Sequence, residues 1–160
     1  MEISDIKFNQ IKEEAEKYYD GIGKIKCPYL NDNVHFNSEG FEHLLFKSWN
    51  KTRSRNEQYT RLRLLPLVCQ VISKSHTLQE YDEKQILARQ KINSRWEKKN
   101  KTAYYYVFVA IIKDCRIKVI VKEIAGGQKF FYSLYPSWKV VFDANGNQRK
   151  VFYSGDLEMD

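Results

Sequence analysis

The sequence predicts an α+β fold in which N-terminal helices pack on one face of a four- to five-stranded antiparallel sheet. Apolar residues recur at helical spacing in the first half of the chain, whereas the second half has alternating apolar and polar residues bounded by turn residues. Helices that precede a run of strands are typical of α+β proteins. With 160 residues, 42% of them hydrophobic, the chain can bury the core of one domain. We expect residues 1–33 to form a helix and a connector, and residues 34–160 to form a single compact unit.

The first helix is expected at residues 3–19, where Ser4 can cap the start and Gly21 can end the helix. Residues 24–33 contain Pro28 and several Asn and Asp residues. This composition favours an extended connection.

A short strand is expected at residues 34–36, followed by a helix that either Asn37 or Ser38 can cap. One face of this helix would carry Phe41, Leu44, Leu45 and Trp49. The next helix has an apolar stripe over residues 59–72 and contains Pro66. The proline either kinks this helix or lies close to its start.

Strand patterns dominate the second half of the chain. They cover residues 77–81, 103–113, 116–124, 129–135, 138–142 and 150–153. Turn residues separate the later strands at 114–115, 125–127 and 145–146. The segment 84–101 has seven cations against the single anion Glu97, and we expect it to form a mobile hairpin or a helical excursion.

Charge and composition narrow the classes of function. The formal net charge is +7 and the pI is about 9.2, which favours an anionic partner such as nucleic acid. The three cysteines are far apart and lack zinc spacing, so we expect a reducing cytoplasm. The N-terminus has no apolar signal region, and the longest apolar run, residues 103–112, is too short to cross a bilayer. We therefore expect no membrane association.

The sequence has no P-loop, GxGxxG, HExxH or GxSxG motif and no clustered set of Asp, Glu and His. We expect neither a metal nor another cofactor. The remaining chemical groups are imidazoles, cations and hydroxyls, which suit RNA cleavage by the neighbouring ribose 2′-OH. That reaction needs a base, an acid and positive charge for the phosphorane.

Among the three histidines, His43 is the candidate general base or acid, because helical packing would hold it at the edge of an apolar face. Cations follow it closely along the chain, and arginine matches phosphate with two parallel hydrogen bonds. The cations of this stretch are Lys47, Lys51, Arg53, Arg55, Arg61 and Arg63.

The strand at residues 129–135 mixes aromatic and hydroxyl side chains. By simple alternation, one face would carry Phe131, Ser133 and Tyr135, and the other would carry Phe130, Tyr132 and Leu134. One face should cover the helices, and the other should present hydroxyls.

Three segments together resemble a known group of proteins. They are Val34-His35-Phe36 with Gly40-Phe41-Glu42-His43-Leu44-Leu45, the Arg-Leu-Arg-Leu-Leu-Pro helix, and Lys118-Val119-Ile120-Val121 with Phe131-Tyr132-Ser133. Over about residues 33–140, the chain resembles phage-associated members of the barnase/EndoU/colicin/RelE-like (BECR) nuclease superfamily. The segment 84–101 and the residues after Val140 have no counterpart in this resemblance.

The resemblance implies helices followed by a four-stranded antiparallel sheet, and metal-independent RNA cleavage, often by a toxin of bacterial conflict or toxin–antitoxin systems. It implies that His43 is the helix-borne histidine and that Ser133, with Tyr132 or Tyr135, supplies the hydroxyls. Arg53 and Arg61 would contact phosphate. It also implies an acidic antitoxin or immunity protein that covers the arginines.

We therefore expect a metal-independent endoribonuclease that forms a cyclic phosphate, of bacterial or phage origin. The expected catalytic residues are His43, Arg61, Ser133 and Tyr135. The expected RNA-binding residues are Lys47, Arg53, Arg55, Arg63 and Tyr132. Two alternatives remain open: a nucleic-acid-binding module without catalysis, and an adaptor that binds an acidic protein. The oligomeric state is left open.

Overall fold

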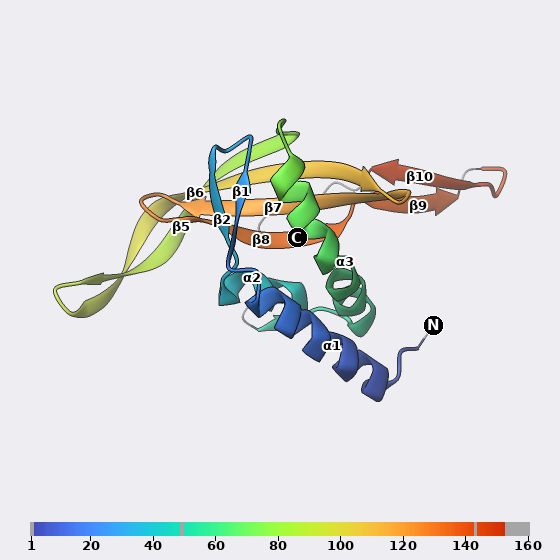
Figure 1. Cartoon of the computed structure of the whole chain (residues 1–160), viewed down its shortest axis with the longest axis horizontal. Coiled ribbons are helices and arrows are strands. Elements are labelled where there is room, and N and C mark those ends of the chain that lie inside the picture. The colour runs from blue at the N-terminus through green and yellow to red at the C-terminus, as the bar shows by residue number, and fades with distance from the viewer. Residues whose placement is uncertain (1, 49, 143, 153–160) are drawn as a thin grey trace.

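Helices precede the main run of strands, which confirms the α+β class. The computed structural model describes residues 2–48, 50–142 and 144–152 (Figure 1). In chain order the elements are α1 (Asp5–Asp20), β1 (Lys24–Cys27), β2 (Asp32–His35), α2 (Ser38–Leu45), β3 (Phe46–Ser48), β4 (Lys51–Thr52), α3 (Arg55–Lys74), β5 (Glu80–Ile92), β6 (Arg95–Ile112), β7 (Cys115–Ile124), β8 (Lys129–Pro136), β9 (Trp138–Phe142) and β10 (Gln148–Phe152).

The main sheet has six strands in the order β1-β2-β8-β7-β6-β5, more than the four to five expected. Neighbouring strands are antiparallel except β2 and β8, which are parallel and pair only at His35 and Phe130. The sheet is larger because residues 24–33 do not form a connection. They contribute to the β1–β2 hairpin, which adds two strands at the β8 edge. β3–β4 and β9–β10 are separate two-stranded ribbons.

Local capping sets the helix boundaries. The Ser4 side chain accepts a hydrogen bond from the Lys7 N–H at the start of α1, and Asn37 caps α2 in the same way through the Gly40 N–H. α3 begins with a capping box in which Ser54 and Glu57 exchange side-chain and backbone hydrogen bonds. This helix continues through Pro66, so the proline does not mark its start.

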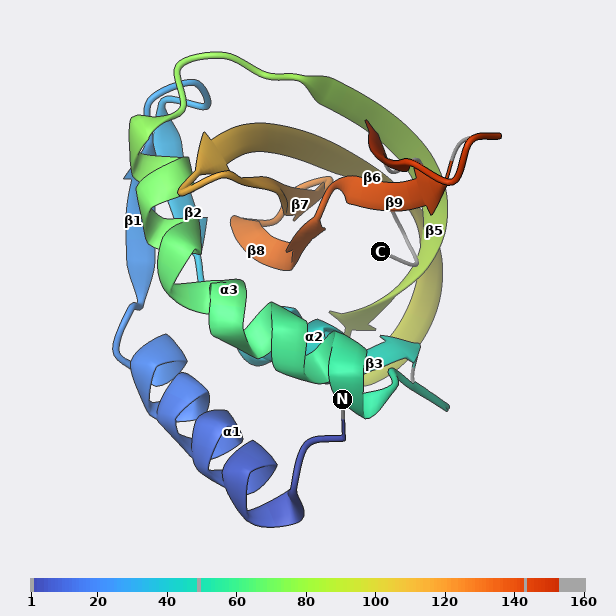
Figure 2. The ribbon, with the colours of Figure 1, turned by 90° about the vertical axis from the view of Figure 1, so that its right-hand side faces the viewer.

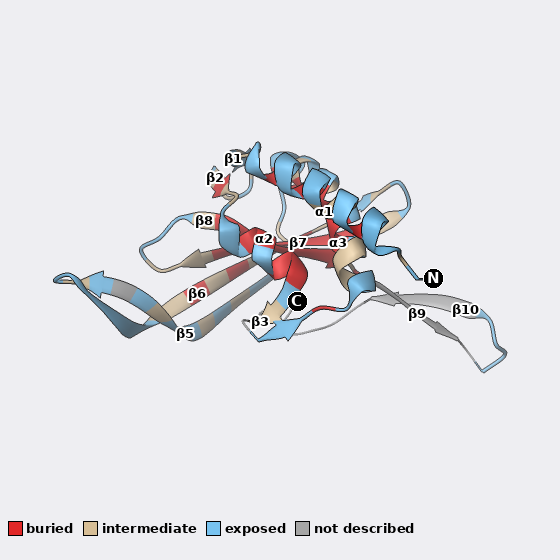
Figure 3. Cartoon of the chain, turned by 90° about the horizontal axis from the view of Figure 1, so that it is seen from below, coloured by how far each residue is buried: buried red, intermediate tan, exposed pale blue. Residues whose placement is uncertain are grey.

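The helices lie on one side of the curved sheet (Figure 2). This side, here called the helix face, forms the larger core, in which α3 packs on β6, β7 and β8, α2 packs on β8, and α1 packs on α3. Buried residues concentrate where α2 and α3 meet the sheet (Figure 3). The opposite side, here called the tyrosine face, is a second buried cluster made of Ala103, Tyr105, Val107, Ile120, Phe130, Tyr132 and Tyr135.

A β-bulge in β8 changes which side chains share a face. Ser133 pairs with Ile120 and Phe131 pairs with Val121, so Tyr132 is an extra residue between two regular pairs. The expected alternation along this strand is therefore wrong. Phe131 belongs to the helix-face core, whereas Tyr132 belongs to the tyrosine face.

The bulge also changes the face that other residues of β8 occupy, relative to the expected alternation. Leu134 joins Phe131 on the helix face, and Tyr135 joins Phe130 on the tyrosine face. Alternation holds along β7, where Ile117, Val119 and Val121 belong to the helix-face core and Ile120 belongs to the tyrosine face.

Candidate functional site

His43 and Arg53 are in direct contact next to β8. His43 lies in the last turn of α2, and Arg53 lies between β4 and the start of α3. The Arg53 Nε donates to the His43 carbonyl oxygen at 2.9 Å, and its Nη2 lies 3.2 Å from the His43 Nε2. As whole residues, His43 and Arg53 are 7% and 3% exposed. The arginine therefore holds both the backbone and the ring of the histidine.

The contact fixes the role of each imidazole nitrogen. A guanidinium has N–H donors and no acceptor, so the hydrogen bond requires Nε2 to accept. The proton of the neutral ring is then on Nδ1. In this tautomer Nε2 is the ring atom with a lone pair that can take up a proton.

The ring of Tyr132 links this pair to the tyrosine face. The His43 and Tyr132 rings are stacked, with centroids 4.2 Å apart and an interplanar angle of 18°. The ammonium of Lys122 lies 4.5 Å from the centroid of the same tyrosine ring and 5.3 Å from that of Tyr105. An imidazole and an ammonium thus contact one aromatic ring.

Two lysines of β7 belong to this region although the sequence interpretation did not assign them a role. Lys118 and Lys122 are buried on either side of Ile120, on the tyrosine face. Lys118 forms an ion pair with Glu80 at 2.9 Å. Burial, together with the nearby positive charge of Lys84, lowers the pKa of Lys122, although the charge of Glu39 partly opposes the shift. A lysine with a lowered pKa is a stronger acid than a solvated one.

Arg61 of α3 reaches the neighbouring part of β8. Its Nη1 donates to the Ser133 Oγ and to the Leu134 carbonyl oxygen, both at 2.9 Å. Its guanidinium carbon also lies 5.4 Å from the centroid of the Tyr135 ring. These contacts join three of the predicted catalytic residues in one group. Since Tyr132 and Ser133 are adjacent, the group continues into the His43–Arg53 pair.

A pocket of about 300 Å³ opens at this end of the site. Arg61 and Tyr135 line it, together with residues from the first turns of α3 and the end of β8, namely Asn56, Glu57, Thr60 and Pro136. Glu57 is held there by its capping interactions. Partial burial opposes the shift, but hydrogen bonds from Ser54 and the charges of Lys47 and Arg53 lower the pKa of Glu57.

The pairing of β8 explains why these groups meet. β2 pairs with β8 at one position only, and β8 also contacts α2 and α3. The bulge places both Tyr132 and Ser133 on the tyrosine face.

Three of the predicted RNA-binding residues lie outside the site or at the margin of its pocket. Arg55 forms an ion pair with Asp5 of α1 and lies over the ring of Phe8. Arg63 is exposed and lines a depression between α1 and α3. Lys47 lies 3.9 Å from Glu57, at the margin of the pocket. The structure therefore brings neither Arg55 nor Arg63 to the site.

No group of three or more His, Cys, Asp or Glu side chains in residues 2–48, 50–142 and 144–152 is arranged to hold a metal ion. None of the helices in these residues combines the length and apolar composition that crossing a membrane requires.

Comparison with known proteins gives no match: no family model, no curated protein and no solved structure matches this chain.

Proposed function

We propose that this protein is a metal-independent endoribonuclease that cleaves RNA through the ribose 2′-OH. The observation that carries the proposal is the contact between His43 and Arg53 beside Tyr132 and Lys122. It brings an imidazole and a guanidinium into contact, with an ammonium against the same tyrosine ring as the imidazole. Such a set can move protons and stabilise an anionic phosphorane.

The reaction would proceed by transfer of the phosphoryl group within the RNA. Arg53 exchanges its contact with the His43 Nε2 for a phosphate oxygen, and this nitrogen takes the proton from the 2′-OH. The 2′-oxygen forms a bond to phosphorus as the bond from phosphorus to the 5′-oxygen breaks. Lys122 gives a proton to the leaving 5′-oxygen, and the product is a 2′,3′-cyclic phosphate. Arg61, held by Ser133, supplies charge to the phosphorane oxygens.

The fold and the position of these residues support membership of the BECR superfamily. An antiparallel run of strands follows the helices, a helix-borne histidine lies beside arginine, and a hydroxyl-bearing strand completes the group. These are the features that the sequence resemblance implies.

The test is cleavage of an RNA of about 20 nucleotides in the presence of EDTA. We expect products ending in a cyclic phosphate, measured by mass spectrometry, and no cleavage of the same RNA with 2′-deoxy residues. His43→Gln keeps the size and polarity of the side chain but removes the base. It should lower the rate by about 10²–10⁴-fold.

The matched control is His76→Gln, because His76 is exposed and lies outside the site. It should cleave like the wild type. Equal rates for His43→Gln and the wild type would remove His43 from the mechanism. Loss of cleavage in EDTA would contradict the metal-independent scheme.

A second candidate function is RNA binding without catalysis. The observation that favours it is the low exposure of His43 and Arg53, together with the occupied Nε2. Salt-sensitive RNA binding with no cyclic phosphate after long incubation would support this function instead.

We also propose that the nuclease acts as a toxin held inactive by an acidic partner. The net charge of +7 and the site cations support an anionic surface on that partner. Expression of the wild type in a bacterial host should stop growth, whereas expression of His43→Gln should not. Growth arrest by both the wild type and His43→Gln would show that toxicity does not depend on this site.

A further inference from the structure

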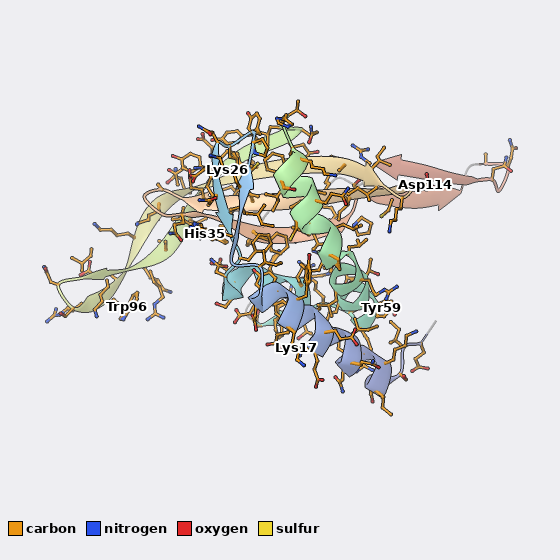
Figure 4. The ribbon with its side chains drawn as sticks, viewed as in Figure 1. Lys17, Lys26, His35, Tyr59, Trp96 and Asp114 are labelled. Carbon is orange, nitrogen blue, oxygen red and sulfur yellow. The ribbon has the colours of Figure 1, made fainter. Side chains whose placement is uncertain are left out.

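The β5–β6 hairpin extends well beyond the rest of the sheet. β6 pairs with β7 only from Ala103 onward, whereas its pairing with β5 continues to Arg95 and Ile92. Residues 85–102, here called the arm, therefore form a two-stranded ribbon that projects from the body (Figure 1). Trp96, near the tip of the arm, is 63% exposed (Figure 4).

The arm carries most of the net charge of the protein. It contains six cations and the single anion Glu97, a net charge of +5 out of +7. A two-stranded ribbon in water is marginally stable by itself, and repulsion among like charges lowers its stability further. The concentration of charge therefore indicates an anionic ligand.

Each face of the arm carries three cations, and the two faces differ in the residues beside them. Directly opposed residues of an antiparallel pair share a face. On one face, Arg95, Lys99 and Lys101 of β6 oppose Ile92, Ala88 and Ile86 of β5. This face has three cations of β6, interrupted by Glu97, beside three apolar residues of β5. The other face carries Arg89, Lys91 and Lys98 together with the exposed Leu87 and Trp96, and Arg89 lies over the ring of Trp96 at 5.4 Å.

The first of these faces is continuous with the candidate site. Alternation along β6 places Lys101 on the same side as Tyr105, and Ile86 packs against the tyrosine-face cluster. The ammonium of Lys84 lies 5.9 Å from the centroid of the Tyr105 ring. From Tyr105 to Arg95 the strand covers roughly 33 Å. This surface is here called the inner face of the arm.

We propose that the inner face of the arm binds the single-stranded RNA that flanks the cleavage site. The phosphates lie along the β6 cations, and the unpaired bases lie over the apolar residues of β5. A base-paired duplex has no exposed base surface for that apolar row. The inference deepens the proposed function, because it assigns the binding of substrate outside the reacting phosphodiester.

The experiment compares two triple variants in the His43→Gln background, in which RNA remains intact. The inner variant combines Arg95→Gln, Lys99→Gln and Lys101→Gln. The outer variant combines Arg89→Gln, Lys91→Gln and Lys98→Gln, and it removes the same charge from the same ribbon. Affinity for labelled single-stranded RNA of about 20 nucleotides is measured by fluorescence anisotropy over a range of salt. Thermal unfolding checks that both variants are folded.

The inner variant should bind this RNA about 10–100-fold more weakly, and its salt slope should fall by about 2. The outer variant should change affinity by less than about threefold, because its cations face away from the RNA path. RNA of about four nucleotides should bind all variants with the same affinity, because it occupies the site and does not reach the arm.

Equal losses in the two variants, or no loss in the inner one, would overturn the inference. Binding to anionic lipid vesicles that depends on the inner cations, with unchanged RNA affinity, would overturn it in favour of a membrane surface. RNA binding through the inner face by a wild type that never cleaves RNA would leave the inference standing and reject the proposed catalysis.

Discussion

Gly40 of α2 lies directly against the Phe131 carbonyl of β8. A Cβ at position 40 would be 2.3 Å from the Phe131 oxygen and 2.6 Å from the Tyr19 hydroxyl oxygen. Tyr19 in turn donates to the Asn37 carbonyl at the start of α2. The absence of a side chain at Gly40 lets α2 approach β8 closely enough to stack His43 on Tyr132.

Gly40→Ala should therefore destabilise the protein by at least about 2–3 kcal/mol, because the added methyl meets backbone that cannot rotate away. Urea denaturation gives this value. The control is Gly21→Ala, where the nearest atoms would be 3.6 Å from the Cβ, and there we expect little change. Similar stability of the two variants would show that α2 shifts freely over β8.

Arg61 should stabilise the fold through its hydrogen bonds to Ser133 and the Leu134 carbonyl. Arg61→Met keeps much of the stem but leaves these acceptors without their charged donor. We expect a loss of about 2 kcal/mol in the free energy of unfolding. The comparison is Arg63→Met on the exposed side of α3, which should change stability by less than about 0.5 kcal/mol.

We expect Lys122 to lower the free energy of unfolding while it supports RNA cleavage. Its pKa is lowered in the fold, chiefly by burial, so the charged form is less favourable there than in the unfolded chain. Below the folded pKa this cost is fully present, and it disappears as the pH rises to the unfolded value near 10.5. Lys122→Met should be more stable than the wild type near neutral pH, with a difference that shrinks toward about pH 10.

The same substitution should abolish RNA cleavage, since methionine can neither give a proton nor balance charge. Denaturation curves at the two pH values and a cleavage assay together check this prediction. A variant that is less stable near neutral pH, or one that still cleaves RNA at the wild-type rate, would contradict it.

Glu57 should make the start of α3 sensitive to acid. Its lowered pKa means that its carboxylate contributes stability above about pH 4.5, and this contribution is lost as the pH falls through the folded value. Glu57→Gln should cost about 0.5 kcal/mol near neutral pH, a modest value because the side chain is partly exposed. The difference from the wild type should shrink as the pH falls below about 4.5. A difference in stability that does not change with pH would mean that the charge of Glu57 does not contribute to the stability of the fold.

The helix positions and the alternation along β7 could be predicted because they depend on local periodicity. The bulge at Tyr132 could not, since it is defined by the pairing of β8 with β7. The β1–β2 hairpin was missed because its strands have four residues each, which is too short for a clear pattern.

Helix geometry also bears on two of the arginines that were predicted to act in the site. Consecutive residues of a helix are separated by about 100°, so Arg63 lies about 200° around α3 from Arg61. One helix could not direct both side chains to one pocket, and this geometry could have been applied before the structure was known. Lys118 and Lys122 were harder to find, because lysine on a strand is usually solvated.

The extra residue in β8 also affects how related sites can be recognised. Two neighbouring side chains, Tyr132 and Ser133, act on the same side of the strand, and the ring of Tyr135 follows two positions later. A search for relatives that assumes strict spacing of two residues along this strand would pass over them. A pattern with adjacent aromatic and hydroxyl residues, placed after a glycine-containing helix with a histidine in its last turn, describes the arrangement better.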